Sequence, residues 1–247
     1  MSFSYEFDHL VVVVRDQMPK ASECFQGLGF HLTKLGKHNL GSMNRLIVLE
    51  SAYVELLGWE AGEPPARKEI ANEPIGLNAL VFRTQNAESC HAALAELGYA
   101  PNPVQELTRP VLIDGKIEQA SFRTVRFSEQ PIPGLRIYFC EHLTPQYVWR
   151  PEDLLHPNML SQLSEIVIES SDVQALYSKL CALLLIDPQQ TSSVTGSTPD
   201  HHQISLGNCR LRIVATNTGK LAQLNSCLIE SPQTGTRLSF GNGLLTH

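Results

Sequence analysis

Three stretches of this chain repeat one layout, and this repetition limits the possible folds more than any other feature of the sequence. Each stretch reads as an apolar strand, then an amphipathic helix, then a closing apolar triplet. The closing triplets are Leu28-Gly29-Phe30, Leu97-Gly98-Tyr99 and Leu184-Leu185-Ile186. An ungapped alignment on these triplets places His9, Asn78 and Glu165 at one equivalent position, near the start of each first strand.

After each helix the pattern changes from helical spacing to strand spacing. In the first repeat HLTKLGKH, MNRLIVLE and AYVELLGW read as three consecutive strands, and the second repeat has similar candidates with Asp114-Gly115 as a hairpin turn. The third supplies HHQISLG and CRLRIVA, followed by LNSCLIES and TRLSF. We therefore predict an α+β fold in which repeated βαβββ units form curved mixed sheets around a pocket, with the helices outside. Another repeat-built α/β fold is the alternative.

Two segments separate the repeats. Residues 60–74 are rich in Pro, Glu and Ala, and residues 144–158 carry three prolines, which exclude a regular strand. We expect paired βαβββ units over residues 1–143, a crossover over residues 144–160, and a third unit with short C-terminal strands over residues 161–247.

Composition and charge exclude several classes of protein. The formal net charge is -6 without a run of basic residues, which argues against nucleic acid as a partner. No apolar stretch is long enough to span a bilayer, and the first residues lack the basic region of a signal peptide. The six cysteines show no CxxC spacing, so we expect buried thiols in a reducing compartment. These features favour a cytoplasmic protein with a small-molecule partner, no membrane contact, and a homodimer as one possible assembly.

Repeated βαβββ units with a histidine on the first strand resemble the vicinal-oxygen-chelate superfamily and, more narrowly, bacterial glyoxalase-like domain proteins. The likeness is carried by FDHLVVVVRD, by GKHNLGSMNRLIVL with YVELLGW, and by FCEHLTPQYVWRPEDLLHPN, and it fades toward the C-terminus. The superfamily contains isomerases, ring-cleaving dioxygenases, thiol transferases, epimerases and proteins that only sequester drugs. The resemblance implies this fold with either a lyase, isomerase or dioxygenase type of enzyme or a non-catalytic binder, because fold alone does not select a reaction.

His9 and Glu55 match the two positions from which a unit of that superfamily presents its metal ligands. An imidazole with a carboxylate suits a divalent Zn, Fe, Mn or Ni ion. Glu55 lies within the apolar strand YVELL, where an unpaired carboxylate is costly to bury. We therefore predict catalytic or metal-binding roles for His9 and Glu55. The alternative is that they hydrogen-bond each other or a ligand and hold no metal.

The second repeat departs from the metal-binding pattern. Asn78 stands where a second histidine is expected, and the last strand offers Tyr138 or Cys140, depending on register, in place of a glutamate. His142 shares a face with Tyr138 and becomes a third metal ligand only if the strand end turns inward. We predict that Asn78, Tyr138 and His142 contact the ligand, with His9 and Asn78 facing one cavity.

Two further predictions concern charged residues. Asn44 and Arg45 follow a Gly-Ser turn, where the backbone can approach a ligand and Arg45 can form a forked contact with a carboxylate or phosphate. An ion pair at the pocket rim is the alternative for Arg45. In the third repeat Glu165 aligns with His9 and Arg212 with Glu55, so we expect a salt bridge there in place of a metal pair.

Together these features predict a protein that acts on, or binds, a small oxygen-bearing metabolite in a pocket of the N-terminal unit pair. Enolisation beside a carbonyl suits His9 and Glu55, because donors or a metal near them can stabilise the developing oxyanion. The alternatives are a non-catalytic sequestering protein and an oligomerisation scaffold.

Overall fold

The structure is a computed structural model that describes residues 5–62, 68–187, 201–219 and 221–245, so part of the first expected linker, residues 63–67, lies outside the described residues. The first repeat forms β1 (Glu6–Arg15), α1 (Met18–Gly27), β2 (Gly36–Lys37), β3 (Met43–Val48) and β4 (Tyr53–Gly58). The short α2 (Lys68–Ala71) precedes the second repeat, which forms β5 (Gly76–Arg83), α3 (Ala87–Glu96), β6 (Gln105–Ile113), β7 (Lys116–Val125) and β8 (Arg136–His142).

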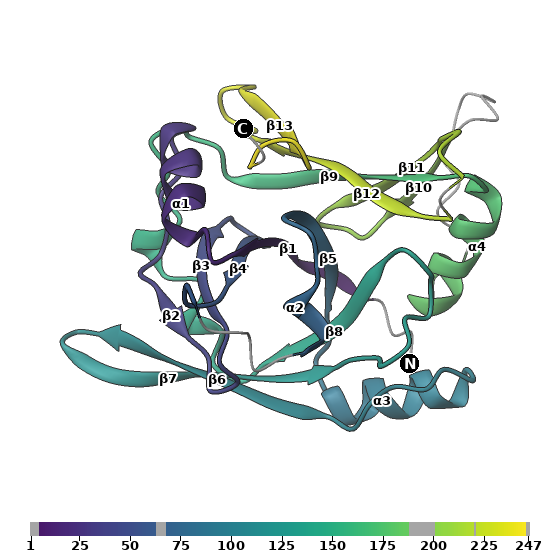
Figure 1. The fold of residues 1–247 in the computed structure, drawn as a ribbon, viewed down its shortest axis with the longest axis horizontal. Coiled ribbons are helices and arrows are strands. Elements are labelled where there is room, and N and C mark those ends of the chain that lie inside the picture. The colour runs from purple at the N-terminus through teal and green to yellow at the C-terminus, as the bar shows by residue number, and fades with distance from the viewer. Residues whose placement is uncertain (1–4, 63–67, 188–200, 220, 246–247) are drawn as a thin grey trace.

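The rest of the chain builds a second group of strands. The third repeat forms β9 (Gln162–Ser170), α4 (Val173–Leu183), β10 (His201–Ser205) and β11 (Arg210–Ala215), followed by β12 (Gln223–Glu230) and β13 (Arg237–Gly241). Helices α1, α3 and α4 lie at the outer sides of the sheets (Figure 1). The predicted α+β class with repeated βαβββ units is confirmed. None of the described helices is long and apolar enough to cross a membrane.

The first two repeats share one eight-stranded sheet with the order β2-β3-β4-β1-β5-β8-β7-β6. At its centre β1 runs antiparallel to β5, and each of these strands runs parallel to the last strand of its own repeat. The sheet curls until its two ends meet (Figure 1): the Asn39 backbone N–H donates to the Thr108 carbonyl at 3.1 Å, and the Asn39 side chain accepts from the Thr108 N–H at 3.2 Å. The result is a nearly closed barrel.

A β-bulge interrupts the first strand of each repeat. In the ladder between β1 and β5 the unpaired residues are Asp8 and Asn78, and the ladder between β9 and β12 repeats both shifts at Ser164 and Asn225. The shifts at Asp8, Asn78 and Ser164 fall within one residue of the positions that the sequence alignment made equivalent, His9, Asn78 and Glu165. Because a bulge breaks the strict alternation of side chains, it can re-aim a side chain that would otherwise point outward.

The two faces of the barrel wall have separate cores. Leu10, Val12 and Val14 of β1 point outward and pack with the helices and with the second sheet. Val11 and Val13 point inward, as the alternation of this strand predicts. The inward face therefore forms the wall of any cavity inside the barrel.

The second sheet, β10-β11-β9-β12-β13, packs on the outer face of the first (Figure 1). The predicted salt bridge of the third unit is confirmed: Arg212 Nε lies 2.9 Å from Glu165 Oε1. After β12 the chain does not build another full unit, because β13 runs antiparallel to β12 whereas β8 runs parallel to β5. The proposed division into units at residues 143 and 160 stays a prediction.

The crossover between the two sheets is attached to the end of β3. Trp149 Nε1 donates to the Leu49 carbonyl at 3.0 Å, and His156 Nε2 donates to the Val48 carbonyl at 2.9 Å. Asn208 adds a contact from the second sheet, since its side chain accepts from the Phe7 N–H and donates to the Phe7 carbonyl. The two Asn208 bonds hold the start of β1 directly before Asp8, where the bulge begins.

Candidate functional site

A small cavity of about 30 Å³ lies inside the barrel and is lined by side chains of both repeats. The polar lining residues are His9, His38, Asn44, Tyr53, Glu55, Arg109, Thr124, Arg126 and Tyr138. A space of this size admits about two water molecules.

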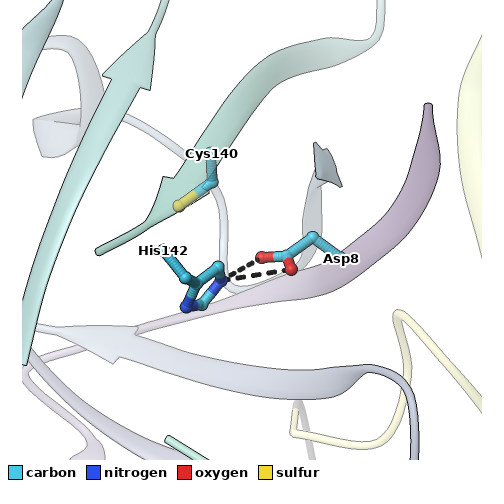
Figure 2. Close-up of side chains that lie close together, drawn as sticks. All are labelled: Asp8, Cys140 and His142. Atoms are coloured by element: carbon cyan, nitrogen blue, oxygen red, sulfur yellow. Dashed lines mark hydrogen bonds and ion pairs between the residues drawn. The ribbon is translucent and has the colours of Figure 1, made fainter. Parts of the chain in front are cut away.

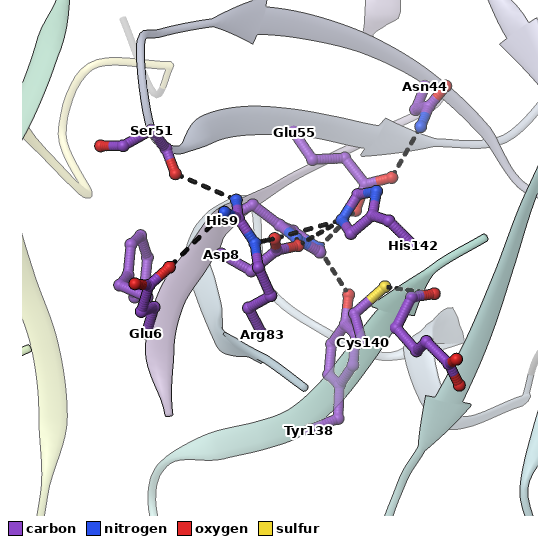
Figure 3. A network of polar contacts seen from close by, with 12 residues as sticks. Glu6, Asp8, His9, Asn44, Ser51, Glu55, Arg83, Tyr138, Cys140 and His142 are labelled. Atoms are coloured by element: carbon purple, nitrogen blue, oxygen red, sulfur yellow. Dashed lines mark hydrogen bonds and ion pairs between the residues drawn. The ribbon is translucent and has the colours of Figure 1, made fainter. Parts of the chain in front are cut away.

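Asp8 is fully buried beside this cavity and accepts hydrogen bonds from three side chains (Figure 3). His9 Nδ1 lies 2.7 Å from one carboxylate oxygen, His142 Nε2 lies 2.8 Å from the same oxygen, and Arg83 Nε lies 2.9 Å from the other. Burial alone would raise the pKa of Asp8, but the charges and hydrogen bonds of His142 and His9 hold this pKa well below its ordinary value. Asp8 is therefore a buried, ionised carboxylate that accepts hydrogen bonds from three side chains.

Asp8 also sets the tautomer of His9. Because an ionised carboxylate only accepts, the His9 Nδ1 atom must carry a proton, and a neutral His9 ring then has its lone pair on Nε2. Nε2 faces the cavity, 3.1 Å from the Tyr138 hydroxyl and 3.7 Å from Glu55 Oε2. The ring stacks on Tyr53 with a centroid distance of 4.3 Å, which restricts its rotation. The arrangement presents an oriented base to the cavity.

Glu55 provides the carboxylate on the neighbouring strand, β4, and it is only 7% exposed. Its Oε1 accepts a 2.7 Å hydrogen bond from the Asn44 amide, which leaves Oε2 directed toward His9 (Figure 3). Asn44 is in turn 3.3 Å from His38 Nε2, and His38 Nδ1 is 2.9 Å from the Ser42 hydroxyl. A chain of polar side chains therefore reaches Glu55 from the turn before β3.

The remaining wall is aromatic. Tyr53 contacts Trp149 edge to face, and Arg126 lies over the Tyr138 ring at 5.2 Å. Burial raises the pKa of the Tyr53 hydroxyl and of the Cys140 thiol, with further increases from the charge of Asp8. Both groups therefore keep their protons at neutral pH.

The structure brings four of the predicted site residues together. His9, Glu55, Asn44 and Tyr138 all line the cavity inside the barrel. Arg45 does not join them, because adjacent residues of a strand point to opposite faces; its Nε donates to the Thr33 carbonyl at 2.8 Å.

Two further predicted residues lie beside the cavity. Asn78 lines a larger adjoining groove of about 1450 Å³ that shares Tyr138 and Arg126 with the small cavity, and a common cavity for His9 and Asn78 stays a prediction. The Asn78 amide is held by Glu73 and Arg136. His142 donates to Asp8 on the far side of His9 and does not lie beside Glu55.

Sequence reasoning missed Asp8 and Arg109. Strict alternation sends Asp8 to the face opposite His9, and only the bulge turns it inward. The cost of burying a carboxylate in an apolar strand, which pointed to Glu55, applies equally to Asp8 in FDHLVVVV and would have singled it out. Arg109 has no comparable sequence feature.

Asp8, Cys140 and His142 place one ligand-type atom each within 4.8 Å of one another (Figure 2). The surroundings of this cluster oppose a cation. Both Asp8 oxygens already accept hydrogen bonds, one from Arg83 and the other from His9 and His142. The His142 nitrogen nearest the carboxylate is the donor of its bond and has no lone pair for an ion, so these three residues do not fit a metal site as they are arranged.

His9 and Glu55 make a better pair of ligand-type atoms, and the carboxylate behind His9 resembles the outer shell of many metal sites. Among the described residues, however, the second repeat adds a tyrosine to this pair and no further imidazole or carboxylate. The other imidazole of the lining, His38, lies 3.3 Å from the Asn44 amide, and among the described residues no third His, Cys, Asp or Glu joins His9 and Glu55 in a cluster of the size that a metal ion needs. The Arg109 guanidinium lines the same cavity and repels a cation. Two ligands fall short of the three or four that hold a divalent ion stably, so the residues do not fit a tightly bound metal.

We accordingly expect elemental analysis of the purified protein to find well under one ion of Zn, Fe, Mn or Ni per chain. A chelator should leave the melting temperature unchanged, because no ion supports the fold. One ion per chain that is lost in the His9→Gln variant would contradict this expectation and would identify His9 as a ligand.

Known proteins show the same fold. A sequence profile of the glyoxalase-like domain matches residues 7–184, and the chain therefore belongs to the glyoxalase-like domain family. A hypothetical protein from Staphylococcus aureus aligns over 96% of this chain and 98% of its own, with a TM-score of 0.71 and 14% identity.

A mutant of 4-hydroxymandelate synthase from Streptomyces coelicolor aligns over 90% of this chain and 69% of its own, with a TM-score of 0.51 and 12% identity. At these identities the two structures establish the fold alone, and they agree with the vicinal-oxygen-chelate resemblance. No functionally curated protein sequence matches this chain.

Proposed function

We propose that this protein binds a small oxygen-bearing metabolite in the barrel cavity and catalyses proton transfer at a carbon beside a carbonyl. One observation carries the proposal: the buried Asp8 carboxylate orients His9 so that its Nε2 atom faces the cavity between Glu55 and Tyr138. Polar side chains that converge inside an apolar barrel are typical of sites for acid–base chemistry or ligand binding.

In the proposed step His9 Nε2 removes a proton from the carbon beside the carbonyl. The C–H electron pair moves into a carbon–carbon double bond, and the carbonyl electrons move onto oxygen to give an enolate. Asp8 and Glu55 stabilise the imidazolium that forms, because their carboxylates lie at its two nitrogen atoms. Return of a proton from Nε2 to the same carbon regenerates the carbonyl compound, so exchange of the imidazolium proton with solvent in the interval replaces the proton on this carbon.

The oxyanion needs donors in the same cavity. The Tyr138 hydroxyl lies 3.1 Å from His9 Nε2, close enough for one ligand to contact both groups, and Arg126 lies over the Tyr138 ring. Donors fixed in a dry, closed site stabilise a developing oxyanion far more than they would in water.

A non-catalytic sequestering protein is the second candidate. The aromatic side chains around the cavity, Tyr53, Tyr138 and Trp149, suit ligand binding, and the second repeat lacks the acid–base pair of the first. The two candidates differ in one measurable property, because a binder retains its ligand without exchanging the ligand's protons.

The test begins by releasing any bound compound from the denatured protein and identifying it by mass spectrometry. The compound, or a panel of 2-oxo and 2-hydroxy acids, is then incubated with the protein in D2O, and proton exchange is followed by NMR. His9→Gln should slow the exchange by about 100-fold or more.

His202→Gln is the matched control. His202 stacks on Tyr177 in the third unit, at 4.6 Å, much as His9 stacks on Tyr53. This variant should exchange protons at the parent rate. Tight binding without exchange would support the sequestering protein, whereas no bound compound and no exchange would refute the proposal.

A further inference from the structure

Arg109 lies at the seam where the curled sheet closes. It is on β6, opposite the small Ala120 of β7, and it is 5% exposed. Across the seam a Cβ atom at Gly36 would lie 3.1 Å from Arg109 Cδ and 2.9 Å from Asn44 Oδ1. The glycine therefore leaves the space through which the arginine side chain reaches the cavity.

The Arg109 guanidinium has no hydrogen bond and no ion pair within 4.0 Å among the residues that the structure describes. Glu55, Tyr53 and Asp153 attract it only from a greater distance, and burial lowers its pKa. A guanidinium carries five N–H donors and stays charged in proteins. These donors are directed at the cavities that Arg109 lines, where an anion can accept hydrogen bonds from them.

Arg109 also lines two cavities. One is the small cavity with His9 and Glu55, and the other is an outer cavity of about 480 Å³ that includes His31, Thr33 and Tyr147. A ligand that enters from the outer cavity meets the guanidinium before it reaches His9.

The charge of Arg109 favours an anion. The described lining of the inner cavity contributes one carboxylate, that of Glu55, which attracts Arg109 from beyond ion-pair distance. A ligand carboxylate would supply the missing partner.

We propose that Arg109 binds the carboxylate of the ligand, so that the small metabolite is an organic acid held with its neighbouring carbon toward His9. This inference rests on the proposed function of the same cavity. A carboxylate suits the site because its two oxygens match the planar fork of the guanidinium. Phosphate is the competing anion for such a fork.

The test uses acetate and acetamide, which have nearly the same shape and differ in charge. Binding is measured by NMR titration at pH 7 and constant ionic strength, with inorganic phosphate as a third probe. We expect the parent protein to bind acetate at least about tenfold more tightly than acetamide, as charge-assisted hydrogen bonds provide. Arg109→Met should abolish this preference, and Arg109→Lys should retain part of it.

Arg123→Met is the matched control, because Arg123 lies on the neighbouring strand and pairs only with the exposed Glu106 among the described residues. It should keep the full preference for acetate. Equal binding of acetate and acetamide by the parent, a preference that survives in Arg109→Met, or tighter binding of phosphate than of acetate would each overturn the assignment. If Arg109→Met does not fold, the parent and Arg109→Lys titrations still decide.

The two proposals fail in different ways. A neutral compound released from the protein would overturn the role of Arg109 and leave the proton-transfer proposal standing. Selective binding of acetate without any proton exchange would support the role of Arg109 and refute catalysis.

Discussion

Asp8→Asn is expected to lower the free energy of unfolding by about 3–5 kcal/mol, the usual cost of removing one partner from a buried charge network. The change leaves the Arg83 guanidinium and two histidines without their anion, and the new amide places a donor against other donors. Urea unfolding at pH 7 measures the effect. The same variant should also slow proton exchange, because His9 loses the group that fixes its tautomer.

Glu6→Gln is the matched control for this prediction. Glu6 lies on the same strand and approaches the same arginine, at 3.7 Å, but its side chain is 56% exposed. A solvated pair of this kind contributes about 0–1 kcal/mol. Equal losses of stability in the two variants would contradict the view of Asp8 as a buried, ionised carboxylate.

The stability that Asp8 provides should depend on pH in one direction. The folded state holds the pKa of Asp8 below its ordinary value of 3.8, so the contribution is complete above that value and is lost as the pH falls toward the folded pKa. The difference between the parent and Asp8→Asn should therefore shrink below pH 3.8. A difference that grows with acid would contradict the assignment.

Glu55→Gln should also slow proton exchange but, unlike Asp8→Asn, should not lower stability. The melting temperature is expected to equal or exceed that of the parent, because replacing a buried carboxylate by a neutral amide removes its desolvation cost. Ligand binding or proton exchange should fall by about 100-fold or more, as for other acid–base residues. Thermal unfolding and the exchange assay measure the two effects on the same sample.

Glu165→Gln is the control for Glu55→Gln. Glu165 occupies the position of His9 in the third unit and pairs with Arg212 at 2.9 Å and Arg210 at 3.7 Å. It should lose up to about 1 kcal/mol of stability and leave the cavity unaffected, because the pair is partly solvated. If Glu55→Gln unfolds the protein while exchange in the remaining folded fraction is unchanged, Glu55 has a structural role only.

The repeats were sufficient to predict how each unit is built. The strand period of two assigns Leu10 and Val12 to one face of β1 and Val11 to the other, and the cores of the structure follow this assignment. Matching CRLRIVA with AYVELLG paired Glu165 with Arg212 across the third unit, because equivalent residues of repeated units occupy equivalent places in their sheets. The same period of two places Asn44 and Arg45 on opposite faces of their strand, because they are adjacent in the sequence.

What the sequence determined by itself is therefore the local pattern: the strands, the helices, their order, and the inward direction of His9 and Glu55. The tertiary structure decided which residues complete the site. Asp8 turns inward only because the bulge forms against β5, and Arg109 reaches the cavity only because the sheet closes on itself near Asn39. Both events depend on the pairing of residues far apart in the chain, whereas a period of two or of 3.6 residues describes only the immediate neighbours of each side chain.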